Sequence, residues 1–142
     1  MTVLVTPDMS NFGGKMHGGE LLKLLDQVAY TCAMRYCSSY VVTLSVDNVL
    51  FKEPIAIGEL LHFNASINYT GKTSMEVGIQ VMAESLETGI SRHTNTCYFN
   101  MVSVNKAGKP IPVAPLEPKT DEEKRRWEDA AARRAIFQKK YQ

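Results

Sequence analysis

Residues 19–36 read GELLKLLDQVAYTCAMRY, and their apolar positions decide how the rest of the chain must fold. At about 100° per residue, these apolar side chains fall within about 60° of Leu25 on a helical wheel. They are Leu21, Leu22, Leu25, Val28, Ala29, Cys32 and Tyr36. The pattern predicts one long amphipathic helix, long enough to cross a sheet. No other part of the sequence has an apolar helical pattern of this strength.

Downstream of this helix the apolar period changes to two, as in half-buried strands. The strands are expected at residues 2–5, 40–51, 60–70, 73–84 and 90–104. The TGKT sequence between two of them predicts a tight hairpin in which Gly71 adopts a positive φ. Because short links and no helices separate the strands, we expect an α+β fold with an antiparallel sheet wrapped around the helix.

The last part of the chain has a different character. Four prolines between positions 110 and 118 interrupt regular structure. Thr120 and Glu123 then form a T-x-x-E capping box, which predicts a polar helix of about 20 residues. Its apolar stripe is thin and consists of Trp127, Ala131 and Ala135. We expect residues 1–118 to form the main domain and residues 119–142 a charged helix of the same domain, on its surface or at an interface.

The overall composition bounds the class of protein. A chain of 142 residues fits one domain with a real core, and 16 basic against 15 acidic residues give no global field for nucleic acid. The longest apolar runs fall short of the ~18 residues of a membrane span, and MTVLVTPDMS lacks the basic start of a secretory signal. Three cysteines without zinc spacing suit reduced thiols. We expect a soluble cytoplasmic protein that binds neither nucleic acid nor membrane.

The glycine-rich segment NFGGKMHGG leads into the helix. The first amides of a helix lack partners and carry partial positive charge, so Gly18 and Gly19 either expose this end to a carbonyl group or only permit a tight turn. Asp26 lies at the rim of the apolar stripe. An acid there either acts as a base in a cleft or pairs with Lys23 on the surface. The residue pattern leaves both pairs of alternatives open.

The remaining polar residues show no metal or nucleotide motif. His17, His62 and His93 lack metal-ligand spacing, so we expect no metal. His17 suits packing or hydrogen bonding, because no Ser or Cys nucleophile elbow lies near it. Asn11 would by default be a loop residue that caps its own turn. The G-x-S-x-G, P-loop and dinucleotide fingerprints are absent from the sequence.

Three stretches taken together resemble a known family. N-x-x-G-x-x-H-G-G-x-x-L-x-x-x-D, VDNVLFKEPIAIGE and INYTGKTSMEVGIQVMAE, in this order, resemble the hotdog-fold acyl-CoA thioesterases. They are most similar to the brain-type cytosolic acyl-CoA hydrolases and their bacterial single-domain relatives, over nearly the whole chain. The resemblance implies a hotdog domain at residues 1–118, with a curved antiparallel sheet wrapped around the helix. It also implies a homodimer with continuous sheets, which commonly assembles into a hexamer as a trimer of dimers.

The resemblance further implies an activity, the hydrolysis of fatty acyl-CoA to free acid and CoA. Asp26 of one subunit and Asn11 of its partner would face one thioester, and Asp26 would either activate water or attack directly. Gly18 and Gly19 would hold the developing oxyanion. The substrate-binding candidates are His17, Lys72, Thr73, Ser74 and Arg92, with the hairpin residues along the CoA pyrophosphate and Arg92 a weaker candidate for the nucleotide phosphates. Because CoA is part of the substrate, no cofactor is expected.

Two rival functions belong to other classes. One is an acyl-CoA sensor that binds without turnover, and the other is a structural subunit of a mixed oligomer. A sensor normally carries an output module, and the sequence has none. A pure binder also has no use for both Asn11 and Asp26, so the enzyme is the favoured interpretation. The sequence does not indicate the acyl chain length.

Overall fold

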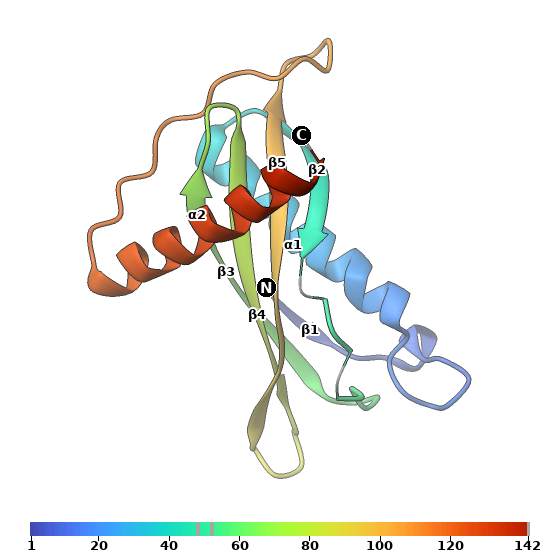
Figure 1. Cartoon of the computed structure of the whole chain (residues 1–142). Helices are drawn as coiled ribbons and strands as arrows, with labels where there is room; N and C mark the ends of the chain where they lie inside the picture. Colours follow the sequence, from blue (N-terminus) through green and yellow to red (C-terminus); the bar gives the residue numbers. More distant parts are fainter. Residues whose placement is uncertain (48, 52, 142) are drawn as a thin grey trace.

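The structure, a computed structural model, describes residues 1–47, 49–51 and 53–141. Helix α1 (Gly18–Cys37) lies on one face of a five-stranded sheet, here called the inner face, and α2 (Asp121–Tyr141) crosses the other, the outer face (Figure 1). The remaining elements are β1 (Thr2–Leu4), η1 (Pro7–Met9), β2 (Tyr40–Asp47), β3 (Leu60–Thr70), β4 (Ser74–Glu84) and β5 (Ser91–Val104).

The strands lie in the order β1-β3-β4-β5-β2, and every neighbouring pair is antiparallel. This confirms the predicted α+β fold, and it makes β2 an edge strand. The predicted strand at residues 40–51 is too long, because β2 ends at Asp47 and Val49, Leu50 and Phe51 lie outside any strand. Residue 48, also in that range, is outside the described residues.

The inner face of the sheet packs on α1 because alternate strand positions are apolar. The buried residues of α1 are Leu21, Leu25, Val28, Ala29 and Ala33, and they meet Leu61, Phe63, Met75, Val77, Ile79, Val81, Cys97, Phe99 and Met101 of the strands. Burial raises the pKa of the Cys97 thiol to about 12, so it stays neutral and packs as an apolar group.

One flank of α1 is not covered by the sheet. Leu22 was expected in the buried stripe but is 40% exposed, and Tyr30 is 39% exposed. These two residues and Asp26 are spaced four apart, so they form one row on the helix surface. Asp26 contacts Thr43 of β2, so this row runs beside the edge strand. The prediction for Leu22 is wrong because the sheet ends there.

The β3–β4 hairpin forms at the predicted place, but Gly71 does not adopt a positive φ. Its N–H donates to the Ser74 carbonyl oxygen at 2.9 Å. A Cβ atom on Gly71 would lie 2.7 Å from Nη2 of Arg134 and 2.7 Å from Oγ of Ser74. The glycine is therefore needed for space against α2 rather than for an unusual backbone conformation, which corrects the sequence-based prediction.

Helix α2 begins with the predicted capping interaction, in which the Glu123 N–H donates to Oγ1 of Thr120 at 3.1 Å. Of the predicted apolar stripe, Trp127 and Ala131 are partly buried but Ala135 is exposed, and the buried residue of the helix is Ala130. The aromatic ring of Trp127 packs on Tyr69 of β3, with centroids 4.7 Å apart. Within the described ranges, no helix is both long and apolar enough to cross a membrane.

Polar contacts dominate the attachment of α2 to the sheet. Arg133 forms two hydrogen bonds to the Glu76 carboxylate of β4, at 3.0 and 2.7 Å, and its guanidinium lies 3.6 Å from the ring centroid of Tyr98. The Glu76 side chain is 5% exposed and also accepts a hydrogen bond from the Asn68 amide. Removing either partner of such a buried pair destabilises the fold, because the remaining charge is left buried and unpaired.

Candidate active site

The start of α1 is organised by a histidine cap. Nδ1 of His17 accepts a hydrogen bond from the Gly19 N–H at 2.9 Å, and a Cβ on Gly19 would lie 3.1 Å from this ring. A Cβ on Gly18 would contact the ring of Phe51 at 3.6 Å. Neither glycine has a positive φ; the missing Cβ of Gly19 leaves room for the His17 ring, whereas a Cβ at Gly18 would make only an ordinary contact with Phe51. No described residue accepts a hydrogen bond from the Gly18 N–H, which points out of the positive end of the helix.

Asp26 lies two turns into the same helix and is held by the sheet edge. Oδ1 of Asp26 accepts a hydrogen bond from the Thr43 hydroxyl at 2.7 Å. No ion pair joins Asp26 to Lys23 within the described residues, so the surface-pair alternative does not hold. The Thr43 contact also fixes the carboxylate on the side of α1 that faces β2. A carboxylate held in one orientation suits a group that acts on a substrate bound at a fixed position.

Thr43 is the residue that the sequence reasoning missed. It precedes a β-bulge, since Thr43 pairs with Met101 and Ser45 pairs with the adjacent Asn100. Bulges of this kind re-aim side chains and are common beside active sites. A signal was present in the sequence: in YVVTLSV, Thr43 is a polar residue two positions after the buried Val41, on the inner face of an apolar strand.

Asn11 adopts the default loop role within its own subunit. Its side-chain oxygen accepts hydrogen bonds from the Gly13 N–H at 2.9 Å and from the Lys15 N–H at 3.1 Å. No described residue is bonded to the side-chain NH₂ group, and the residue is exposed. No contact joins Asn11 to Asp26 within this described chain.

The hairpin candidates lie away from the start of α1. Ser74 pairs with Val102, which pairs with Val42, so the hairpin is at the end of the sheet where β2 begins. Oγ of Ser74 accepts a hydrogen bond from Arg134 at 2.6 Å, and the backbone carbonyls of Lys72 and Thr73 are also bonded. Figure 1 shows this hairpin at the opposite end of the molecule from the first turn of α1. One subunit therefore does not bring these candidates together with Gly18.

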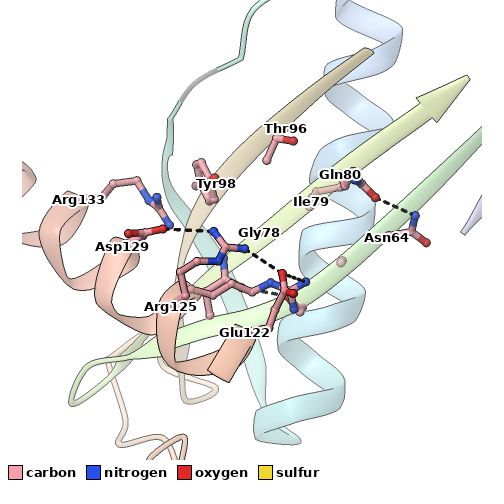
Figure 2. Close-up of a pocket in the computed structure, with 14 residues that line it drawn as sticks. Asn64, Gly78, Ile79, Gln80, Thr96, Tyr98, Glu122, Arg125, Asp129 and Arg133 are labelled. Carbon is pink, nitrogen blue, oxygen red and sulfur yellow. Dashed lines mark hydrogen bonds and ion pairs between the residues drawn. The ribbon is translucent and has the colours of Figure 1, made fainter. Parts of the chain in front are cut away.

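A separate polar cleft of about 400 Å³ lies on the outer face, under α2 (Figure 2). Its floor carries uncharged polar side chains such as Asn64, Gln80 and Thr96, and its roof carries Arg125 and Arg133. Both arginines are paired with carboxylates of the protein. The cleft contains none of the candidate catalytic residues. Among the described residues, no group of three His, Cys, Asp or Glu side chains is placed to hold a metal ion.

Comparison with known proteins shows the family of the chain. The family model described as the Thioesterase superfamily matches residues 13–90, more than half of the chain. The chain belongs to the thioesterase superfamily. This superfamily member is 55% identical over 141 residues to Protein VdlD of Helicobacter pylori, which covers 99% of this chain and 80% of that protein. It is 35% identical over 132 residues to the cytosolic acyl coenzyme A thioester hydrolase of Rattus norvegicus, covering 92% of this chain but 35% of the relative.

Solved structures of the superfamily confirm the hotdog fold. An apo-hexameric acyl-CoA thioesterase superposes with a TM-score of 0.93 at 40% identity, covering 99% of this chain and 90% of that one. The acyl-CoA hydrolase of Staphylococcus aureus, in complex with butyryl coenzyme A and coenzyme A, gives a TM-score of 0.90 at 30% identity over 99% and 85% of the two chains. Alanine variants of that hydrolase at one Asn, one Asp and one Thr are also similar, and these three positions are spaced as Asn11, Asp26 and Thr43 are here.

Proposed function

We propose that this superfamily member hydrolyses fatty acyl-CoA to a free acid and CoA. The observation that carries the proposal is the Asp26 carboxylate, which Thr43 orients at 2.7 Å on a helix whose first amide, the Gly18 N–H, donates to no described residue. A thioester hydrolase needs this combination, because a group must promote attack on the carbonyl carbon while a donor stabilises the oxyanion. The acyl-CoA hydrolases among the relatives support the same choice of substrate.

In this mechanism Asp26 either takes a proton from the attacking water or attacks the carbonyl carbon itself. Both routes use the same position of the carboxylate. The Gly18 N–H polarises the thioester carbonyl, and each such donor is worth roughly 10²–10³ in rate in other enzymes. Gly19 has a different part, since its N–H already donates to His17 and thereby keeps the first turn in place.

The site is completed by a second copy of the chain. Strand β2 is an edge strand, and the row of Leu22, Asp26 and Tyr30 beside it is uncovered. Pairing of β2 with β2 of a partner would join the sheets and cover this row. Asn11 of the partner would then bring its free NH₂ group to the thioester. A hexameric structural neighbour supports further assembly into a trimer of dimers.

The cellular setting follows from the substrate and the relatives. CoA enters as part of the substrate, so the reaction needs no further cofactor. We place the protein in the cytoplasm, where the relatives named cytosolic hydrolases act. Neither a membrane nor a nucleic acid is required by this chemistry.

The proposal is tested by measuring thiol release from a panel of acyl-CoAs, from acetyl to palmitoyl. We expect turnover that is highest for one chain-length class, because the acyl group must fit a tunnel of fixed length. The same panel is measured by calorimetry for binding. Binding of acyl-CoA without thiol release would identify an acyl-CoA sensor instead, and neither binding nor release would indicate a structural subunit.

Mixing two inactive variants tests the shared site. Asn11→Ala and Asp26→Ala proteins are each expected to be inactive, and after subunit exchange the mixture should recover up to about one quarter of the wild-type rate. The gain arises because some hybrid interfaces pair two intact residues from different chains. Exchange is followed independently by mass spectrometry with one isotope-labelled variant. Complete exchange without recovery would place both residues in the same subunit's site.

A further inference from the structure

The Arg92 side chain on β5 donates all of its described hydrogen bonds to residues 53–59, called here the anchor loop, which lead from β2 into β3. Nη1 donates to Glu53 at 2.8 Å, and Nη2 donates to the Pro54 carbonyl at 2.9 Å and to Glu59 at 2.8 Å. The Glu59 side chain is 13% exposed, so this contact is the best shielded from solvent. The hydrogen bond that Arg92 donates to Glu59 raises the pKa of Arg92; burial lowers it by less, and Glu53 raises it further.

The anchor loop is bonded in turn to the segment that enters α1. The Met16 N–H donates to the Ile55 carbonyl at 2.8 Å, and both side chains are buried. Oε1 of Glu59, which accepts from Arg92, also accepts the Ala56 N–H at 2.8 Å. One carboxylate therefore ties the guanidinium to the loop backbone directly beside the residue that holds Met16. Met16 immediately precedes the His17 cap.

The same loop also reaches the turn that carries Asn11. Lys15 and Ala56 form an antiparallel bridge. The Lys15 carbonyl accepts the Asn11 N–H at 2.6 Å, and the Lys15 N–H donates to the Asn11 side chain. Arg92 is thus linked through Glu59 and Ala56 to Lys15 of the Asn11 turn, and through the neighbouring Ile55 to Met16, just before the start of α1.

We propose that Arg92 is a positioning residue for thioester hydrolysis, which fixes the anchor loop and through it the Gly18 amide and the Asn11 turn. The inference rests on the proposed function. It differs from the sequence-based expectation that Arg92 binds a phosphate of CoA, because here three acceptors of the protein already occupy both Nη atoms. A misplacement of about 1 Å at a reacting group can cost roughly 10²-fold in rate, so loosening this loop should affect the chemical step.

The test compares acyl-CoA with the same acyl group on N-acetylcysteamine, a thioester without nucleotide or phosphates. For Arg92→Met we expect kcat to fall about 10- to 100-fold with both substrates, while KM for acyl-CoA changes by less than about threefold. Arg92→Lys restores part of kcat, since an ammonium group reaches one carboxylate but not all three acceptors. A rise in KM for acyl-CoA alone, with the truncated substrate unaffected, would overturn the proposal in favour of phosphate binding.

Arg125→Met is the matched control, because Arg125 is also paired with two carboxylates, Glu122 and Asp129, but on α2. Its kcat should equal that of the wild type. If Arg92→Met does not fold, Glu53→Ala removes one of the three acceptors and should lower kcat to a smaller extent. Hydrogen exchange of the Met16 amide gives a readout that needs no activity, and we expect it to quicken in both variants. Unchanged exchange would overturn the positioning role even if the wild type proved not to be a hydrolase.

Discussion

Asp26→Asn is expected to lower kcat for acyl-CoA hydrolysis by roughly 10²–10⁴-fold, with folding and oligomeric state unchanged. The amide keeps the shape of the side chain and accepts the Thr43 hydroxyl through its oxygen. It neither takes a proton from water nor attacks a carbonyl carbon at neutral pH. Steady-state thiol release, together with light scattering for the oligomer, measures both parts of the expectation.

Glu20→Gln provides the control, because it makes the same charge change in the first turn of α1 without a contact to Thr43. We expect it to retain near wild-type kcat. Thr43→Val should lie between the two, since it leaves Asp26 charged but removes the hydrogen bond that orients it. Wild-type turnover in Asp26→Asn would remove this carboxylate from the chemistry.

Arg133→Met is expected to lower the free energy of unfolding by about 3–5 kcal/mol, because it strands the Glu76 carboxylate in a largely buried position. Burial has the largest influence on the pKa of Arg133 and lowers it, but the hydrogen bond and charge of Glu76, together with Tyr98 and Asp129, raise that pKa overall, so the guanidinium stays charged. Urea denaturation followed by circular dichroism measures the loss. The effect should be confined to stability, since Arg133 lines the outer-face cleft, which contains none of the candidate catalytic residues (Figure 2).

The exposed Arg125→Met variant is the comparison for this loss, and we expect it to cost less than about 1 kcal/mol. A double change of Arg133→Met with Glu76→Leu should recover stability relative to Arg133→Met alone, because no buried charge is then left unpaired. Equal losses for Arg133→Met and Arg125→Met would show that the buried pair contributes no more than a surface one.

The fold was largely predictable because the spacing of apolar residues along the chain distinguishes the helix from the strands. The change from a helical stripe to alternation placed α1, β3, β4 and β5 within one residue or so of their observed ends. The predictions failed at residues whose burial or conformation depends on another element of the fold. Leu22 is apolar and lies on the expected face, but the sheet ends before it. Gly71 is a typical turn glycine whose real constraint comes from Arg134, 63 positions further along the chain.

The candidate site was predictable in part, and mainly through the family resemblance. Asp26 has no helical signature that separates a working acid from a surface acid, and its contact with Thr43 of the edge strand depends on tertiary structure that the sequence pattern does not show. The role of Arg92 was beyond reach, because it depends on a loop that β-strand pairing brings alongside it. His17 was expected to form a packing or hydrogen-bonding contact, and its cap on Gly19 confirms this.

The open edge of β2 makes the unassembled chain prone to aggregation. Tyr40, Val42 and Leu44 are each at least half exposed on a strand with one unpaired side, and no proline or lysine blunts it. Strands of this kind attract any other strand with a free edge, including those of misfolded chains. The proposed pairing of β2 with β2 of a second copy would cover this edge, so a newly made copy would be exposed to aggregation until it dimerises. The fraction of chains that aggregates before assembly would then depend on the rate of synthesis and on the supply of chaperones.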